Sequence, residues 1–152
     1  TNHSTSEGRI LGVEEINLQD GNNFLDLTST TTSLATQNIN ITTGSGNDIL
    51  WLSDANEIIS SGDGNDKIII NGGIDSLTTG LGNDTVTITN STGNLTLLDF
   101  NPLLDKFIFH TSAKNLTTEN NTIHVNNSLG GYTLTFNDNT DLSSLNSFST
   151  FI

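Results

Sequence analysis

The chain contains no cysteine, no methionine and only one proline among 152 residues. Without cysteine, disulfide bonds cannot stabilise the fold. Hydrophobic residues make up only 32% of the sequence, a small share for a globular protein, so the core alone offers limited stability. A bound metal is the remaining candidate for additional stabilisation.

Basic residues are also scarce, which limits the partners. Seventeen acidic residues against four basic ones give a formal charge of -13. Nucleic acids and anionic membranes both bind clustered lysine and arginine, so we expect neither as a partner. A compact chain with this charge repels itself unless cations neutralise it. The composition therefore favours cation binding.

Long apolar runs are absent as well. No stretch approaches the roughly 20 residues of a membrane-spanning helix, so we expect no transmembrane segment. Residues 1–4 show neither the basic nor the apolar region of a classical signal peptide. Because methionine is missing even at the first position, we expect the chain to be a fragment of a larger protein.

A repeat of nine residues is the most informative feature that the sequence does contain. The pentapeptide G-x-G-N-D recurs every eighteen residues, at 44–48, 62–66 and 80–84, and weaker copies lie half-way between. The eighth position of the nine-residue units over 43–96 is always apolar: Leu50, Ile59, Ile68, Leu77, Val86 and Leu95. Such self-similarity is typical of a solenoid.

Each unit has a glycine-rich half that must turn and a short half that can be a strand. A strand of about three residues does not pair stably alone. Two units make one coil, and successive coils stack roughly 4.8 Å apart, the spacing of hydrogen-bonded strands. The sequence therefore predicts an all-β fold, a parallel β-roll (β-solenoid) over residues 1–98, with regular repeats at 43–96.

The residues before the repeats also alternate between apolar and polar. The segments 15–18, 24–27 and 38–41 read as short strands with irregular spacing. We expect them to form less regular coils of the same solenoid. A separate N-terminal cap is the alternative.

Residues 99–152 are predicted to form a C-terminal cap. Strands expected at 106–110, 122–125 and 132–136 alternate more clearly, which suggests an antiparallel β cap over the open end of the solenoid. A short helix is expected at 141–145.

The sixth position of the units carries the acidic residues. It reads Asp48, Glu57, Asp66, Asp75, Asp84 and Gly93. Calcium takes about six to eight oxygen ligands from carboxylates and main-chain carbonyls. Glycines allow a turn to aim several carbonyls at one point. We therefore predict that Asp48, Asp66 and Asp84 line one edge of the solenoid, with calcium between successive turns.

These turns resemble the repeats-in-toxin (RTX) family, whose nonapeptide G-G-x-G-x-D-x-U-x winds into a calcium-loaded parallel β-roll. The resemblance covers 43–87. It implies that each ion lies between turns two units apart. One ion would be held by Gly44, Gly46, Asp48, Ser61, Asp63 and Asp66, and a second by Gly62, Gly64, Asp66, Thr79, Leu81 and Asp84. Gly80 and Gly82 of the third turn belong to the same candidate set.

The chain departs from the RTX pattern on the opposite edge. Serine or alanine replaces the glycines there, and Glu57, one methylene longer than aspartate, takes the acidic position. A third ion between Glu57 and Asp75 would use the carbonyls of Ser53, Ala55, Ile70 and Gly72. We predict a calcium ladder on one edge only.

Residues 98–107, L-D-F-N-P-L-L-D-K-F, resemble the D-F-x-x-x-x-D-K-I segment that follows the roll in RTX proteins. There the two aspartates can hold a further ion, which makes Asp99 and Asp105 candidate ligands. The alternative is a turn and a solvated loop.

No catalytic motif accompanies the repeats. His3, His110 and His124 are dispersed without an H-E-x-x-H spacing, and no serine stands in G-x-S-x-G. Periodic carboxylates fit repeated ligation better than one catalytic pair. We therefore predict that the chain is not itself an enzyme and that its cofactor is Ca²⁺.

By resemblance, RTX regions stay unfolded in the calcium-poor cytosol, pass through a type I secretion channel and fold on calcium outside the cell. We expect a calcium-binding RTX β-roll from the C-terminus of a larger secreted bacterial cell-surface protein, a surface-layer protein or adhesin. The secretion signal would correspond to 141–152. The implied partners are calcium ions and the type I secretion machinery, with self-association and a cell-surface polysaccharide left open.

Two alternatives remain for the whole protein. One is the secretion and folding domain of an extracellular protease or lipase, whose catalytic motif would lie upstream of Thr1. The other is a sugar- or ice-binding β-solenoid, for which the threonine-rich strand at 85–89 is the relevant feature.

Overall fold

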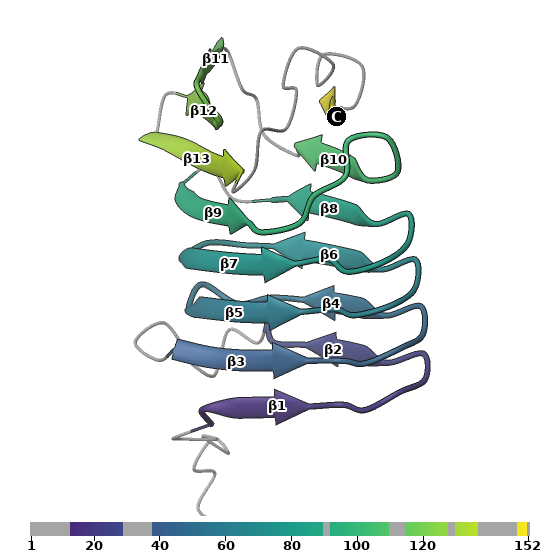
Figure 1. The fold of residues 1–152 in the computed structure, drawn as a ribbon. Helices are drawn as coiled ribbons and strands as arrows, with labels where there is room; N and C mark the ends of the chain where they lie inside the picture. Colours follow the sequence, from purple (N-terminus) through teal and green to yellow (C-terminus); the bar gives the residue numbers. More distant parts are fainter. Residues whose placement is uncertain are drawn as a thin grey trace, which may run out of the picture.

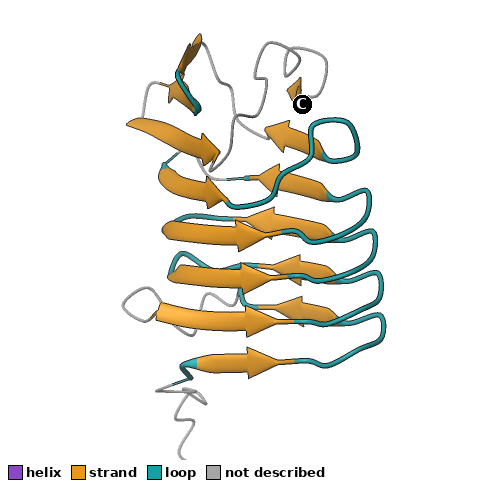
Figure 2. Ribbon diagram, viewed as in Figure 1, coloured by secondary structure: helices purple, strands orange, loops and turns teal. Residues whose placement is uncertain are grey.

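The computed structural model describes residues 13–28, 38–89, 92–109, 115–127, 130–136 and 149–151. These residues form strands, turns and loops (Figure 2), so the predicted all-β class is confirmed. No helix capable of crossing a membrane occurs among them. The strands are β1 (Glu15–Asn17), β2 (Phe24–Asp26), β3 (Asn38–Thr42), β4 (Ile49–Trp51), β5 (Asn56–Ser60), β6 (Lys67–Ile70), β7 (Ile74–Thr78), β8 (Thr85–Ile88), β9 (Gly93–Leu97), β10 (Lys106–Phe109), β11 (Asn115–Glu119), β12 (Thr122–Asn127), β13 (Gly130–Phe136) and β14 (Ser149–Phe151).

The strands form two sheets that face each other along the axis of a solenoid (Figure 1). Sheet A has the order β1-β3-β5-β7-β9-β13-β12-β11, and sheet B has the order β14-β10-β8-β6-β4-β2. The chain crosses from one sheet to the other at each turn between β1 and β10. All pairings among these ten strands are parallel. The predicted parallel β-solenoid is therefore confirmed.

The nine-residue period builds the core. Leu50, Ile68 and Val86 are stacked in register on sheet B, and Ile59 is paired with Leu77 on sheet A. Each of these side chains is at most 2% exposed. One apolar residue per unit thus produces two facing columns, and each coil is stabilised mainly by contact with its neighbours.

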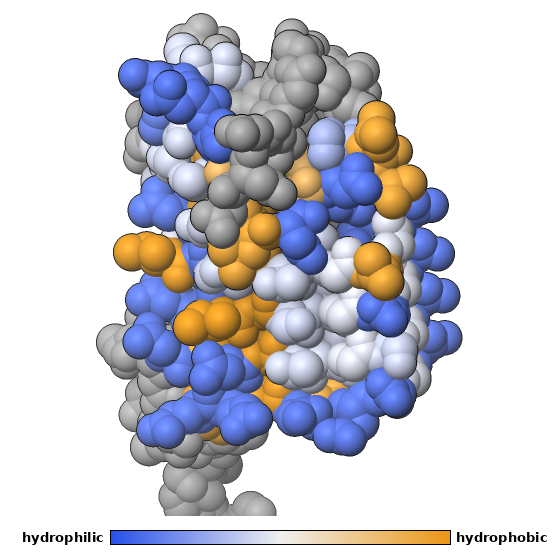
Figure 3. Space-filling view, viewed as in Figure 1, coloured by the Kyte–Doolittle hydropathy of each residue, from blue (hydrophilic) through white to orange (hydrophobic). Residues whose placement is uncertain are grey.

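The outward residues of sheet A are mixed in character. The hydroxyl residues Thr42, Ser60 and Thr78 lie in one row across three strands. Ile58 and Ile74 are 55% and 64% exposed on the same sheet. Figure 3 shows the resulting mixture of pale, blue and orange side chains. The alternation of inward and outward residues follows from the pleat of the strand.

The strands before the repeats belong to the same solenoid. Ile16 pairs with Ile41, and Leu25 pairs with Leu50. The prediction of irregular N-terminal coils is confirmed, and the alternative of a separate cap is wrong. The spacing between paired residues is 25 here instead of eighteen, because the connection to β3 is longer.

The last repeat unit differs from the predicted register. Leu77 pairs with Leu97, and Asp75 pairs with Leu95, so the spacing has grown to twenty residues. Leu95 therefore stands in the column of the carboxylates and not in the eighth-position column. The prediction that the nine-residue period continues to residue 96 is wrong, because the connection from β8 to β9 contains two additional residues.

An antiparallel cap ends sheet A, as predicted. β13 pairs in parallel with β9 and antiparallel with β12, which pairs antiparallel with β11. The strand expected at 106–110 is not part of this cap. It is β10, which pairs in parallel with β8 and so adds one more coil to the solenoid. The expected helix at 141–145 lies outside the described residues, as do His3 and His110.

The close stacking of coils predicts a large effect for the substitution Gly62→Ala. Gly62 has a φ of 86°, and a Cβ atom on it would overlap the carbonyl oxygen of Gly44. We expect a loss of about 3 kcal/mol in the free energy of unfolding, measured by urea denaturation in calcium.

Gly21→Ala is the matched control for this substitution. Gly21 also has a positive φ, 114°, but nothing lies within 4 Å of the added Cβ atom. Only backbone strain remains, which costs about 1 kcal/mol. Equal losses in Gly62→Ala and Gly21→Ala would contradict the proposed clash between coils.

Candidate metal centre

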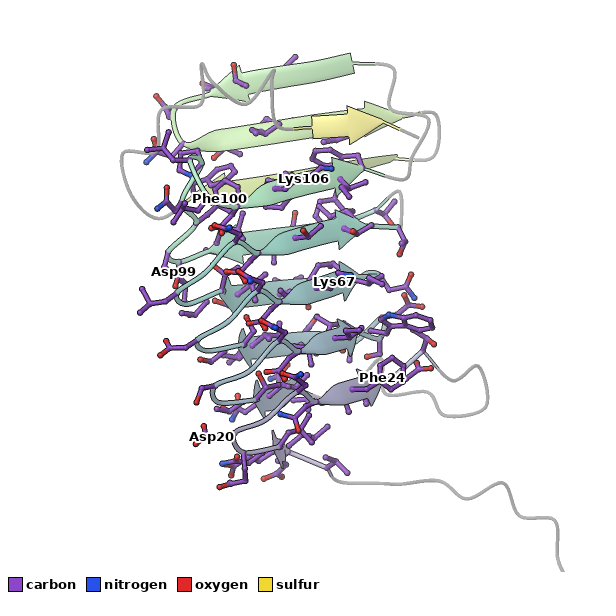
Figure 4. The ribbon with its side chains drawn as sticks, turned by 90° about the vertical axis from the view of Figure 1, so that its right-hand side faces the viewer. Asp20, Phe24, Lys67, Asp99, Phe100 and Lys106 are labelled. Atoms are coloured by element: carbon purple, nitrogen blue, oxygen red, sulfur yellow. The ribbon has the colours of Figure 1, made fainter. Side chains whose placement is uncertain are left out.

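Turns stack along one edge of the solenoid at 18–23, 43–48, 61–66, 79–84 and 98–105. We call this the aspartate edge. Its turns are the teal loops on the right of Figure 2. Figure 4 views the solenoid from this side, with Asp20 near the foot of the edge and Asp99 near the top.

Two carbonyl groups of turn 43–48 face the following turn. The oxygen of Gly44 accepts a hydrogen bond from the N–H of Asp63 at 3.1 Å. The oxygen of Gly46 lies directly against the Cα of Gly64, since a Cβ atom there would overlap it. Both oxygens therefore lie in the gap between the two turns.

Two carbonyl groups of turn 61–66 face back into the same gap. The oxygen of Asp63 accepts the N–H of Gly46 at 2.8 Å. The oxygen of Ser61 accepts the hydroxyl of Thr43 at 2.6 Å. The structure thus brings the four main-chain oxygens predicted for the first ion into one gap.

The gap between turns 61–66 and 79–84 repeats this arrangement. Gly62 O accepts the N–H of Leu81 at 3.2 Å, and Leu81 O accepts the N–H of Gly64 at 2.7 Å. Thr79 O accepts the hydroxyl of Ser61 at 2.9 Å. The oxygens of Gly62, Thr79 and Leu81, three of the four predicted for the second ion, therefore lie in this gap.

Gly80 and Gly82 allow this second gap to close. A Cβ atom on Gly80 would overlap the oxygen of Gly62, and one on Gly82 would overlap the oxygen of Gly64. Both glycines belong to turn 79–84, which is followed along the edge by the turn that carries Asp99 and Asp105.

Asp48, Asp66 and Asp84 form a hydrogen-bonded column inside the edge. The N–H of Asp48 donates to Oδ1 of Asp66, and the N–H of Asp66 donates to Oδ1 of Asp84, both at 2.8 Å. Each of the three side chains is 1% exposed. Their Oδ2 atoms are buried and accept no hydrogen bond from any described residue.

Buried carboxylate oxygens without a donor are costly. Burial raises the pKa of Asp66. Burial also raises the pKa of Asp84 to about 6, and the charges of Asp105, Asp66 and Asp99 add to this shift. A cation in each gap would remove the cost, because it would satisfy the Oδ2 atoms.

The donor set of each gap fits calcium. Two carboxylates and four carbonyls supply only oxygen ligands, in a number within the range that calcium takes. Among the described residues, no three acidic or histidine side chains converge on one point. Main-chain carbonyls would therefore have to supply most of the ligands of a metal at either gap.

A second column, made of asparagines, runs outside the aspartates. The N–H of Asn65 donates to Oδ1 of Asn47 at 2.7 Å, and the N–H of Asn83 donates to Oδ1 of Asn65 at 2.8 Å. These bonds connect neutral groups and need no cation. They explain why each pentapeptide carries asparagine before its aspartate.

Asp99 and Asp105 lie at the upper end of the aspartate edge. Asp99 accepts the N–H groups of Thr79 and Gly80, both at 2.8 Å. Asp105 accepts the N–H of Asp84 at 3.0 Å and that of Asn101 at 2.8 Å, so it continues the column. Every oxygen of the two carboxylates thus has a donor. A further ion at this pair stays a prediction.

Glu57 and Asp75 meet on the opposite edge, where they are 0% and 2% exposed. The N–H of Glu57 donates to Oδ1 of Asp75 at 3.0 Å. Oε1 of Glu57 accepts the N–H of Ser53 at 3.1 Å and also its hydroxyl. Oε2 of Glu57 and Oδ2 of Asp75 are buried without a donor among the described residues.

The carbonyl groups of the opposite edge do not converge as those of the aspartate edge do. The oxygen of Ile70 accepts the N–H and the hydroxyl of Thr89, each at 3.0 Å, so it faces the following coil. Its counterpart Ser61 O faces the preceding turn. Ser53 O accepts the N–H of Gly72 at 3.4 Å. A cation between Glu57 and Asp75 would lack the Ile70 ligand.

A shared proton would satisfy the two orphaned oxygens of this pair without a metal. Burial raises the pKa of Glu57 and raises the pKa of Asp75 to about 8. Burial and the charges of Asp75 and Glu57 also raise the pKa of Tyr132, whose buried hydroxyl has no partner among the described residues. Two neighbouring carboxyl groups that share one proton titrate as a pair.

These shifts predict that acid promotes folding of the metal-free protein. The pKa of Asp75 is about 8 in the folded state against 3.8 ordinarily. Between these values the folded state binds more protons than the unfolded state, so the free energy of unfolding falls as pH rises. Circular dichroism of dialysed, metal-free protein should show more β structure at about pH 5 than at about pH 8. Asp75→Asn should weaken this dependence, and a folded fraction that rises with pH would contradict it.

Turn 18–23 is a member of the aspartate edge that the sequence reasoning missed. The N–H of Asn23 donates to Oδ1 of Asp48 at 2.7 Å, and the N–H of Asn47 donates to Oδ1 of Asn22 at 2.8 Å. Oδ1 of Asp20 accepts the N–H and hydroxyl of Ser45 at 2.9 and 2.8 Å, bonds that lower the pKa of Asp20. The dipeptide Gly-Asn shared by 21–22 and 46–47 was the signal, hidden by the spacing of 25.

No protein-family model, curated protein or solved structure matches the chain. The fold and the edge alone therefore define its class. It is a parallel β-solenoid with a buried column of aspartates along one edge.

Proposed function

We propose that the chain is a calcium-binding β-roll of the RTX type. One ion lies between turns 43–48 and 61–66, and a second lies between turns 61–66 and 79–84. The observation that carries this proposal is that Oδ2 of Asp48, Asp66 and Asp84 is buried and accepts no hydrogen bond from the described residues. The carboxylates of Asp66 and Asp84 each reach the turn below through Oδ1, at the gaps that the main-chain carbonyls line.

The chemistry of the gaps favours calcium over other metals. All candidate ligands are hard oxygen atoms, without the nitrogen or sulfur ligands that zinc and copper select. Magnesium holds its water ligands tightly and demands near-ideal octahedral geometry, so a gap rich in main-chain carbonyls suits it poorly. The chain also carries a net charge of -13, which attracts divalent cations.

We further propose that calcium acts as a folding switch. A site assembled from two turns of the folded solenoid does not exist in the unfolded chain, so binding free energy becomes folding free energy. The RTX resemblance of 43–87 supports a role outside the cell, where calcium is abundant, within a secreted bacterial surface protein. The absence of catalytic motifs in the sequence favours a structural role for the chain.

Calcium stoichiometry tests the proposal. Native mass spectrometry of the full chain should show at least two calcium ions per molecule, and magnesium at the same concentration should not displace them. Asp26→Asn is the matched control, because Asp26 is exposed on sheet B and, among the residues that the structure describes, its carboxylate bonds only to Thr28. It should leave the number of ions unchanged. Absence of bound calcium would overturn the proposal.

A further inference from the structure

The gap between turns 18–23 and 43–48, which we call the first gap, contains a side-chain hydrogen-bond donor. The side-chain nitrogen Nδ2 of Asn23 lies 2.9 Å from the oxygen of Gln19, 2.8 Å from that of Gly21 and 3.3 Å from that of Thr43. Three carbonyl oxygens from two successive turns thus converge on one amide nitrogen. Such convergence of carbonyls is the arrangement that a cation otherwise requires.

Asn23 occupies the position of the aspartates one turn below Asp48. Its N–H donates to Oδ1 of Asp48 at 2.7 Å, as the N–H of Asp48 donates to Asp66 at 2.8 Å. The carbonyls around Nδ2, those of Gln19, Gly21 and Thr43, are the counterparts of Gly44, Gly46 and Ser61 in the next gap.

The main chain of the two turns also has the same shape. The N–H of Gly21 donates to the oxygen of Ser45 at 2.6 Å, as that of Gly46 donates to Asp63 at 2.8 Å. Gln19 has a φ of 64°, the left-handed conformation that glycine supplies in the later turns. The first gap is therefore built like the calcium gaps, with a different group inside.

We propose that the side-chain amide of Asn23 takes the place of a calcium ion in the first gap and closes it without metal. The NH₂ group carries two donors and no charge, and it satisfies carbonyls that would otherwise face one another. Asparagine and aspartate have nearly the same shape, so residue 23 decides between amide and metal. The role of calcium in the later gaps rests on the proposed function, whereas the amide contact does not.

This amide gives the solenoid an end that needs no cation. Asp48 has a neutral side chain, that of Asn23, on the side away from Asp66, so the repulsion between stacked carboxylates ends at Asp48. The carbonyl groups of the first gap are paired whether or not calcium is present. Turn 43–48 thus packs on turn 18–23 without a cation. It then presents Gly44, Gly46 and Asp48 to the ion proposed between turns 43–48 and 61–66.

The substitution Asn23→Asp tests whether the gap is a replaced calcium site. It leaves the carbonyls of Gln19, Gly21, Thr43 and Ser45 in place and adds a second carboxylate, so native mass spectrometry in calcium should show one more ion per chain than the wild type. Asn22→Asp is the matched control. It adds the same charge at an exposed position, and a carboxylate oxygen there can still accept the N–H of Asn47, as Oδ1 of Asn22 does. Equal ion counts in the two variants would overturn the inference.

Asn23→Ala tests the amide contact separately from calcium binding to the other gaps. In the full chain under folding conditions, backbone amides of turn 43–48 should exchange hydrogen about tenfold faster than in the wild type, with an unchanged number of ions. Exchange as slow as in the wild type would overturn the inference. If no variant binds calcium, the proposed function fails, and the exchange rates still decide the role of the amide.

Discussion

Metal-free protein at neutral pH is expected to lose most of its β-sheet circular dichroism signal and to regain it when millimolar calcium is added. The buried Oδ2 atoms of Asp48, Asp66 and Asp84 are the reason. Without a cation they leave charged oxygens in the interior without a partner, stacked one above another. The core is too thin to compensate for this cost.

The magnitudes support a complete transition. An unsatisfied buried polar group costs about 1–3 kcal/mol, and a charged one costs more. The free energy of unfolding of a domain is only about 5–15 kcal/mol. A ligand at about 100 times its dissociation constant stabilises the folded state by about 2.7 kcal/mol per site. Two calcium sites therefore contribute an amount comparable to the total stability of a small domain.

The measurement requires two controls. Magnesium at the same ionic strength separates specific binding from screening of the net charge, and it should restore little of the signal. The pH must stay near neutral throughout, because acid alone is expected to stabilise the metal-free solenoid. A β-sheet spectrum that is identical with and without calcium would contradict calcium-coupled folding.

The coils over 43–88 could be predicted because a solenoid is locally determined. Each residue of the regular units meets only its own coil and the next one, so a period of eighteen residues fixes which side chains stack. Leu50 on Ile68 and Asp48 beside Asp66 follow directly from this period. The class of fold and the column of aspartates along one edge of the solenoid could therefore be predicted from the spacing of residues in the sequence.

The coils outside this region could not be placed from the sequence, because a change in loop length shifts every later column. Two additional residues before β9 move Leu95 into the place of a carboxylate. A longer connection before β3 hides the equivalence of Asn23 and Asp48. Strand pairing decides the register in both cases, and it depends on contacts between coils that spacing alone does not reveal.

The direction in which individual carbonyl groups point could not be predicted from the sequence either. Ser61 and Ile70 occupy the same position of their units, yet their oxygens face opposite neighbours along the solenoid axis. The Ile70 oxygen accepts hydrogen bonds from Thr89 of the following coil, whereas the Ser61 oxygen accepts one from Thr43 of the preceding coil. The contrast between the two edges thus depends on side chains of the adjacent coils as well as on the glycines and acids of the turn itself.

Asp66→Ala is expected to impair calcium binding more than Asp48→Ala. The RTX resemblance makes Asp66 a ligand of both proposed ions. In the column of aspartates it is the middle member, since its Oδ1 accepts the N–H of Asp48 below and its N–H donates to Asp84 above. Its loss should remove two ions from the count in native mass spectrometry. Asp66→Ala should also fail to regain its β-sheet circular dichroism signal at a calcium concentration that folds the wild type, because each lost site removes about 2.7 kcal/mol at about 100 times its dissociation constant.

Asp48 and Asp84 each border one of the two predicted ions, so their alanine variants should each lose one ion and still fold, at a higher calcium concentration than the wild type. Asp63→Ala is the matched control on the same turn as Asp66. The Asp63 side chain is exposed, and its predicted ligand is the main-chain oxygen, which alanine retains. Asp63→Ala should therefore bind as many ions as the wild type. Equal losses in Asp48→Ala, Asp66→Ala and Asp84→Ala would contradict ions shared between successive gaps, because only sharing makes the middle aspartate differ from its neighbours.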